Sequence, residues 1–142
     1  MQINPNDIVA ALDVGDVRVG VASTRAMVAL PKPLVTLKRD ENFWQQLQTC
    51  IHENEIAALV IGLPRGLDGQ ETEQTKKVRQ FTAQLREKID LPTVFQDEAA
   101  TSVKAEAELT ARGKGYNVSM VDSLAATYIL EDFLRENRRG KP

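Results

Sequence analysis

Short apolar segments rich in β-branched residues open the chain, and their patterning predicts strands. Residues 8–14 (IVAALDV) form a run typical of a buried strand. In residues 17–24 (VRVGVAST), the valines at alternate positions, starting with Val17, would share one face of a second strand. Gly15 lies between the two segments and favours a tight turn, so we predict a β-hairpin. A third strand is expected over about residues 33–37.

Helical and strand-like segments alternate farther along the chain. Residues 40–55 have apolar side chains at helical spacing, and the uninterrupted apolar run 56–62 is typical of a central strand covered on both faces. A glycine-rich loop follows at 62–70, and a helix then continues to about Lys88. The remaining predicted elements are a strand at 93–97 and two helices at 101–113 and 119–137.

The order of these elements, β-β-β-α-β-α-β-α-α, indicates the fold class. Consecutive strands with tight links favour an antiparallel meander, whereas strands that alternate with helices favour parallel crossovers. We therefore predict an α/β fold with a five-stranded mixed sheet, in which an antiparallel meander is followed by parallel strands and helices cover both faces. The chain, residues 1–142, is expected to form a single domain with a basic tail from about residue 136.

Composition is that of an ordinary globular protein, with 42% hydrophobic and 27% charged residues among 142. No apolar run approaches the roughly 20 residues of a membrane helix, and the N-terminus lacks the layout of a signal peptide. We therefore expect a cytoplasmic protein with no membrane partner. One cysteine, Cys50, and one histidine, His52, argue against a disulfide, a Cys/His zinc cluster and a Ser-His-Asp triad. The net charge of -2 does not indicate a nucleic-acid binder, although basic residues gather locally.

Three acidic residues, Asp13, Glu98 and Asp122, lie where predicted elements begin or end, each within apolar sequence. Asp13 ends the first strand and Glu98 follows the fifth, so the two would meet if strands one and five are neighbours. Three carboxylates within about 5 Å would repel one another by roughly 3 kcal/mol per pair at an effective dielectric near 20. A hard divalent cation, Mg²⁺ or Mn²⁺, is the natural compensator for this charge. Two such ions could activate a water molecule and stabilise the leaving oxygen of a phosphodiester.

The direction of the Asp122 side chain can be predicted from its position on the expected helix. Helical spacing puts Asp122 in line with Ala126 and Ile129, so its side chain is expected to face inward. A polar stripe that runs through Ser123 and Thr127 would face outward. This inward orientation is unusual for an acid and makes Asp122 the most informative of the three.

Each acid also has a purely structural interpretation. Ser119 and Asp122 match the spacing of a helix capping box. Asp13 could form a turn with Gly15. Glu98 could simply be exposed to solvent after its strand.

Four segments, in order and at family-like spacing, resemble the motifs of the YqgF/RuvX family: ALDVGDVRVGVA, VIGLPRGLDGQETEQTKKVRQF, DEAATSVKAE and VDSLAATYIL. The resemblance covers about residues 8–134 and implies a ribonuclease-H-like fold. It also implies a nuclease that matures the 5′ end of 16S ribosomal RNA or resolves Holliday junctions. The implied partners are structured RNA or branched DNA, with a pre-ribosomal particle as a further candidate. The sequence leaves the choice between a monomer and a homodimer open.

The resemblance further implies roles for individual residues. The metal-binding catalytic acids would be Asp13, Glu98 and Asp122, with two Mg²⁺ or Mn²⁺ ions. Gly15 would permit the hairpin turn, while Gly62 and Pro64 would shape a loop at the mouth of the site. Arg18 and Thr101 would lie near the substrate, although Thr101 could instead cap a helix. Arg65, Arg112 and Lys114 are candidates to bind the substrate in place of family basic residues that this chain lacks.

The chain departs from the family pattern at positions close to the acids. Ala99 stands where family members usually carry arginine, and Ser119 and Met120 stand where they often carry lysine. Both changes remove positive charge that would bind a polyanion, which motivates an alternative hypothesis. In that alternative, the chain is a non-catalytic nucleic-acid-binding or ribosome-assembly module that keeps the fold. A third hypothesis, a sugar-kinase-like ATP site, requires two such domains, and 142 residues supply one.

Overall fold

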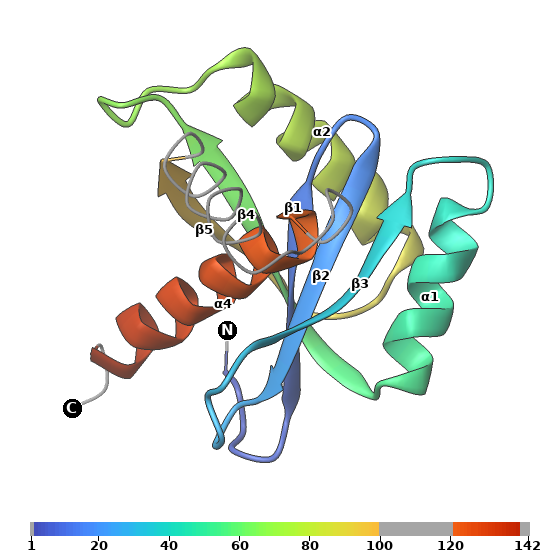
Figure 1. Cartoon of the computed structure of the whole chain (residues 1–142), viewed down its shortest axis with the longest axis vertical. Helices are drawn as coiled ribbons and strands as arrows, with labels where there is room; N and C mark the ends of the chain where they lie inside the picture. Colours follow the sequence, from blue (N-terminus) through green and yellow to red (C-terminus); the bar gives the residue numbers. More distant parts are fainter. Residues whose placement is uncertain (1, 100–120, 140–142) are drawn as a thin grey trace.

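The computed structural model describes residues 2–99 and 121–139, which form a five-stranded mixed sheet with helices on both faces (Figure 1). The strands are β1 (Ile8–Val14), β2 (Arg18–Arg25), β3 (Lys32–Lys38), β4 (Ile56–Arg65) and β5 (Thr93–Ala99). Their order across the sheet is β3-β2-β1-β4-β5. The first three strands pair antiparallel, and β4 pairs parallel with both β1 and β5. The predicted meander followed by parallel strands is confirmed.

The helices are α1 (Phe43–Glu53), α2 (Glu73–Lys88) and α4 (Val121–Arg139). Because α4 continues to Arg139, residues 136–139 of the predicted basic tail are helical. The predicted helix at 101–113 lies outside the described residues. Among the helices that the structure describes, none is long and apolar enough to cross a membrane.

The sheet separates two apolar cores, because successive side chains of a strand point to opposite faces. On one face, Leu12 of β1 packs in a cluster with Leu47 of α1 and Phe81 of α2. On the other face, Val9 of β1 packs in a cluster with Leu130 of α4. Of the described helices, α4 alone covers this second face, and it contacts all five strands as it crosses them (Figure 1).

Strand β4 is longer than predicted and includes residues expected to form a loop. Its pairing with β5 continues from Gly62, opposite Gln96, to Arg65. A proline has no N–H group to donate to a neighbouring strand, which made Pro64 look like part of a loop. The pairing of β4 with β1 ends at Ile61, so Pro64 lies where β4 has one described strand beside it. A proline is tolerated at such an edge-like position.

One expectation about the hairpin is wrong, and the condition for Asp13 to meet Glu98 is not fulfilled. Val17 lies in the turn between β1 and β2 and is 61% exposed, so it does not share the buried face of β2. Strands one and five are not neighbours, because β4 lies between them. The continuous apolar run of β4 suits this position. A strand inside a sheet that has helices on both sides is covered on both faces.

The start of α2 is tied to the end of β4. Thr72 caps the helix, and its hydroxyl and that of Thr75 each accept a hydrogen bond from the other residue's backbone N–H group, which forms a capping box. The hydroxyl of Thr75, which is fully buried, also donates to the backbone carbonyl of Pro64. This contact fixes the carboxyl end of β4 against the first turn of α2.

Candidate active site

Asp13 lies at the carboxyl end of β1, on the sheet face that α4 covers. The residues that alternate with it, Val9 and Ala11, belong to the α4 core, so Asp13 shares their face. In the antiparallel pairing of β1 with β2, Asp13 is opposite Gly20. This register places Asp13 next to a position that carries no side chain.

The missing side chain of Gly20 allows α4 to approach the sheet closely at Asp122. A methyl group at Gly20 would lie 2.1 Å from both the carbonyl carbon and the carbonyl oxygen of Asp122. A glycine within a strand often marks such a close backbone approach. Asp13 and Asp122 are thus brought to the same part of the site, each beside Gly20.

Asp122 is buried, with 8% of its surface exposed, which confirms the inward orientation expected from helical spacing. Its Oδ2 atom accepts a hydrogen bond of 3.0 Å from Nε of Arg18, and the two side chains form an ion pair. The prediction that Ser123 and Thr127 face outward is wrong, because both residues are also buried. They are covered because α4 lies against β2 and β3, and the Thr127 hydroxyl is satisfied by the backbone carbonyl of Ser123.

Glu98 lies on the same sheet face but faces a different part of α4. Its buried Oε1 atom has no hydrogen-bond partner among the described residues. Burial is the main cause that raises the pKa of Glu98 to about 9, and the nearby carboxyl groups of Asp132 and Glu136 raise it further. Gln96, two residues earlier on β5, donates a hydrogen bond of 2.8 Å to Glu136. The carboxyl end of β5 therefore packs against the second half of α4.

The strand register explains why Glu98 is apart from the other two acids. Because β4 lies between β1 and β5, the axes of these two strands are roughly 10 Å apart. Glu98 is opposite Pro64, which lies three residues beyond the last β4 residue that pairs with β1. Along α4, Asp132 is about 15 Å from Asp122 at the usual helical rise. Asp13 therefore lies near the first turn of α4, which carries Asp122, whereas Glu98 faces the second half of this helix.

A divalent cation prefers carboxylate oxygens, and the chemistry of all three acids suits such an ion. The unpartnered Oε1 of Glu98 is the type of buried atom that a cation would satisfy. However, residues 2–99 and 121–139 contain no group of three or more acidic, histidine or cysteine side chains that could hold a metal ion. As arranged here, Asp13, Glu98 and Asp122 do not form one ligand set.

Comparison with known proteins identifies the family. The sequence profile described as "RuvX: Holliday junction resolvase" matches residues 7–136. The chain belongs to this family. A relative named "Putative pre-16S rRNA nuclease" in Crocosphaera subtropica is 40% identical over 131 residues, which span 89% of this chain and 92% of the relative. A relative of the same name in Fusobacterium nucleatum is 35% identical over 129 residues, which span 87% of this chain and 94% of the relative.

Solved structures show the same fold at low sequence identity. The fowlpox virus Holliday junction resolvase aligns with a TM-score of 0.54 and 11% identity, over 92% of this chain and 99% of the viral chain. RuvC of T. thermophilus, solved in complex with a Holliday junction substrate, aligns with a TM-score of 0.53 and 15% identity, over 92% of this chain and 96% of RuvC. The RuvX chain thus has the ribonuclease-H-like fold that its motifs imply.

The glycines and the proline predicted to shape the RuvX site have distinct positions. Gly15 is in the hairpin turn, where its N–H group donates to the carbonyl of Arg18 at 2.9 Å. Gly62 and Pro64 are in strand β4 and not in a loop. A methyl group at Gly62 would lie 2.4 Å from the terminal carbon of Ile129, so this glycine, like Gly20, lets α4 lie close to the sheet.

The basic residues predicted to contact substrate in this RuvX protein differ in their surroundings. Arg18 lies beside Asp122, as described above. Arg65 lies on β4 with Nε 3.2 Å from Asp97 and Nη1 3.6 Å from Glu71, so two carboxylates already compensate its charge. Thr101, Arg112 and Lys114 lie outside the described residues, as do Ser119 and Met120.

Sequence reasoning missed the residues that surround Glu98 and the close approach at Gly20. The glycine within the apolar strand sequence VRVGVA is a signal that could have predicted the contact with α4. Asp132 and Glu136 carry no comparable signal, because acids on a helix are most often on its solvated face. Their position beside Glu98 depends on how α4 crosses the sheet.

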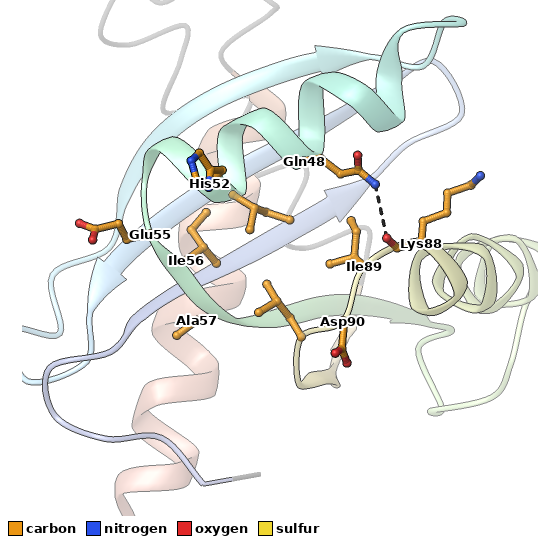
Figure 2. A pocket seen from close by; sticks show the side chains of 10 residues that line it. Gln48, His52, Glu55, Ile56, Ala57, Lys88, Ile89 and Asp90 are labelled. Carbon is orange, nitrogen blue, oxygen red and sulfur yellow. Dashed lines mark hydrogen bonds between the residues drawn. The ribbon is translucent and has the colours of Figure 1, made fainter.

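A hollow of about 510 Å³ lies at the opposite end of β4, between α1 and the segment that follows α2 (Figure 2). Ile56 and Ile89 contribute apolar surface, and Gln48 donates a hydrogen bond of 3.3 Å to the carbonyl of Lys88. None of the residues predicted to act in the RuvX site lines this hollow. It therefore has no part in the site at the carboxyl ends of the strands.

Proposed function

We propose that this RuvX protein is a nuclease that hydrolyses phosphodiester bonds. Its substrate is either the precursor of 16S ribosomal RNA, cut at the 5′ end during maturation, or branched DNA, and it acts in the cytoplasm. The names of the relatives and the profile match support both substrates. The observation that carries the proposal is the buried Asp122, ion-paired with Arg18 and packed on Gly20 directly opposite Asp13.

The residues around Asp122 suit the handling of a phosphodiester. Arg18 uses Nε to bind Asp122, and its remaining N–H groups can bind phosphate oxygens through the planar guanidinium fork. Asp13, half-buried at the end of β1, can accept a hydrogen bond from a water molecule and orient it toward phosphorus. These two roles require that Asp13 and Arg18 flank the same substrate phosphate.

We further propose that activity requires two Mg²⁺ or Mn²⁺ ions, with Asp13, Glu98 and Asp122 as ligands and Glu98 apart from the other two acids. The oxygen donors and the unpartnered Oε1 of Glu98 support this requirement. A bound divalent ion would act as a Lewis acid toward the phosphodiester. The phosphate contact of Arg18 and the orientation of water by Asp13 are proposed from the positions of these two side chains alone. Neither role requires a bound ion.

The second candidate function is a non-catalytic nucleic-acid-binding or ribosome-assembly module. The absence of a metal-holding group of acids among residues 2–99 and 121–139 favours it. Such a module would bind structured RNA or branched DNA without cleaving either. The two candidates therefore differ in turnover and not in binding.

The test is cleavage of a labelled four-way DNA junction and of a labelled RNA hairpin from the 16S precursor, each with Mg²⁺, with Mn²⁺ and with EDTA. Asp13→Asn should lower the cleavage rate by roughly 100-fold or more without lowering the melting temperature. The matched control is Asp16→Asn, an exposed acid of the same hairpin that is ion-paired with Lys77 at the surface.

Different outcomes overturn different parts of the proposal. Equal cleavage by wild type and by Asp13→Asn would rule out the site described above. Cleavage that persists in EDTA would remove the metal requirement and leave the nuclease in place. Binding of both probes without cleavage under any condition would favour the non-catalytic module.

A further inference from the structure

A second hollow, of about 420 Å³, lies beside Asp122 between α4 and the outer strand β3. Its polar lining comes from four residues on three elements, namely Arg18, Thr36, Lys38 and Ser123. Its apolar lining comes from Pro33, Leu34 and Val35 of β3. The hollow therefore adjoins the proposed site through Arg18 but extends to the edge of the sheet.

Two cations lie directly opposite each other in this hollow. Arg18 of β2 pairs with Lys38 of β3, and both line the same hollow. Like charges at opposite positions of an antiparallel pair lower the stability of a sheet. Asp122 compensates Arg18, but no carboxylate of the described ranges forms an ion pair with Lys38. Within the described ranges, Lys38 is therefore a cation of the hollow whose charge no ion pair compensates.

We propose that this hollow binds a backbone phosphate of the substrate strand, adjacent to the phosphate that is cleaved. The ammonium group of Lys38 holds this phosphate, and Arg18 lies between it and the phosphate that is cleaved. Leu34 and Pro33 provide an apolar surface for the adjoining sugar. The proposal rests on the nuclease function proposed above and extends its substrate contact to β3. Contacts to phosphate and sugar do not read base sequence, so the subsite orients a strand of any sequence.

The arrangement gives Lys38 effects of opposite sign on binding and on stability. Replacement by alanine removes a phosphate contact, and it also removes the repulsion between Lys38 and Arg18. Lys38→Ala should therefore weaken nucleic-acid binding while the melting temperature stays the same or rises. A lysine with a merely structural role would lower both.

The experiment measures binding of a fluorescein-labelled four-way DNA junction and a labelled RNA hairpin by anisotropy in EDTA, over a series of salt concentrations. Lys38→Ala should weaken binding severalfold and reduce the slope of log affinity against log salt by about 1. Lys38→Arg should restore both values. Lys32→Ala is the matched control, since Lys32 is an exposed lysine of the same strand that does not line the hollow.

The subsite is wrong if Lys38→Ala and Lys32→Ala have equal effects, or if neither probe binds to the wild-type protein. Wild-type cleavage of the same probes with Mg²⁺ or Mn²⁺ is measured in parallel. If the wild type cleaves but Lys38 behaves like Lys32, the subsite is wrong and the nuclease function stands. If Lys38→Ala alone weakens binding and no cleavage occurs, the subsite stands and the nuclease function is wrong.

Discussion

At the scale of single residues, Gly20 determines how closely Asp122 approaches the sheet. The atoms that a methyl group at Gly20 would meet belong to the backbone of α4, at Asp122 and Ser123. A helix backbone cannot move aside without displacing the packed residues that follow it. The position of the Asp122 carboxylate therefore depends on the absence of a side chain on the neighbouring strand.

Gly20→Ala should destabilise the protein by about 1–3 kcal/mol or more, because α4 must move away from β2. Gly62→Ala should cost less, since the atom it meets is the flexible end of the Ile129 side chain. Urea unfolding of both variants measures the difference. Addition of Ile129→Val should recover much of the loss in Gly62→Ala and none of the loss in Gly20→Ala. Equal losses for the two glycines would contradict the close approach of α4 at Asp122.

Glu98 should make the stability of the metal-free protein depend on pH. Its pKa is raised from 4.5 to about 9, so between these values the folded chain binds more protons than the unfolded chain. The contribution of Glu98 to stability is therefore complete below about pH 4.5 and is lost as the pH rises toward 9. Urea unfolding in EDTA from pH 5 to 9, within this range, should show a decline that Glu98→Gln makes less steep.

Glu71 provides a contrast to Glu98 in the same experiment. A hydrogen bond from Arg79 is the main cause that lowers the pKa of Glu71, so its contribution is lost as the pH falls. Glu71→Gln should therefore change the acid end of the stability curve and leave the decline from pH 5 to 9 in place. A Glu98→Gln variant with the wild-type slope in that range would show that Glu98 is not buried beside Asp132.

At the scale of elements, α2 holds the carboxyl end of β4 through Thr75. Thr75→Val keeps the shape of the side chain but leaves the Pro64 carbonyl and the Thr72 N–H group without this partner. We expect a loss of about 1–3 kcal/mol in the free energy of unfolding. Thr82→Val is the control, because the Thr82 hydroxyl binds the Val78 carbonyl of its own helix. If thermal or urea unfolding shows equal losses for both, Thr75 does not link α2 to β4.

Helices and strands can be predicted from the sequence where they depend on the local pattern of apolar and polar residues. The apolar runs predict β1 and most of β4, and helical spacing predicts that Asp122 faces inward. The end of β4 could not be predicted in this way, because Pro64 is allowed in the strand only by the earlier end of the β1 pairing. The burial of Ser123 and Thr127 depends on which strands α4 covers, a contact between segments distant in the sequence.

At the scale of the whole molecule, the sequence predicts a mixed sheet with antiparallel and parallel strands. It does not predict the order of the strands across the sheet. The meander and the parallel crossovers follow from loop lengths and from the alternation of strands and helices. The insertion of β4 between β1 and β5 does not, and this insertion separates Asp13 from Glu98. Helical spacing predicts the inward orientation of Asp122, whereas the mutual arrangement of the three acids depends on how α4 packs across the whole sheet.

The position of α4 on the sheet also bears on when the protein can become active. During synthesis, the sheet and the two helices on its opposite face emerge from the ribosome before α4 does. Until then the apolar surface around Val9 and Val60 has no covering among the described helices, and Asp122 has not joined Asp13 and Arg18. A nascent chain that lacks α4 is therefore an incomplete nuclease.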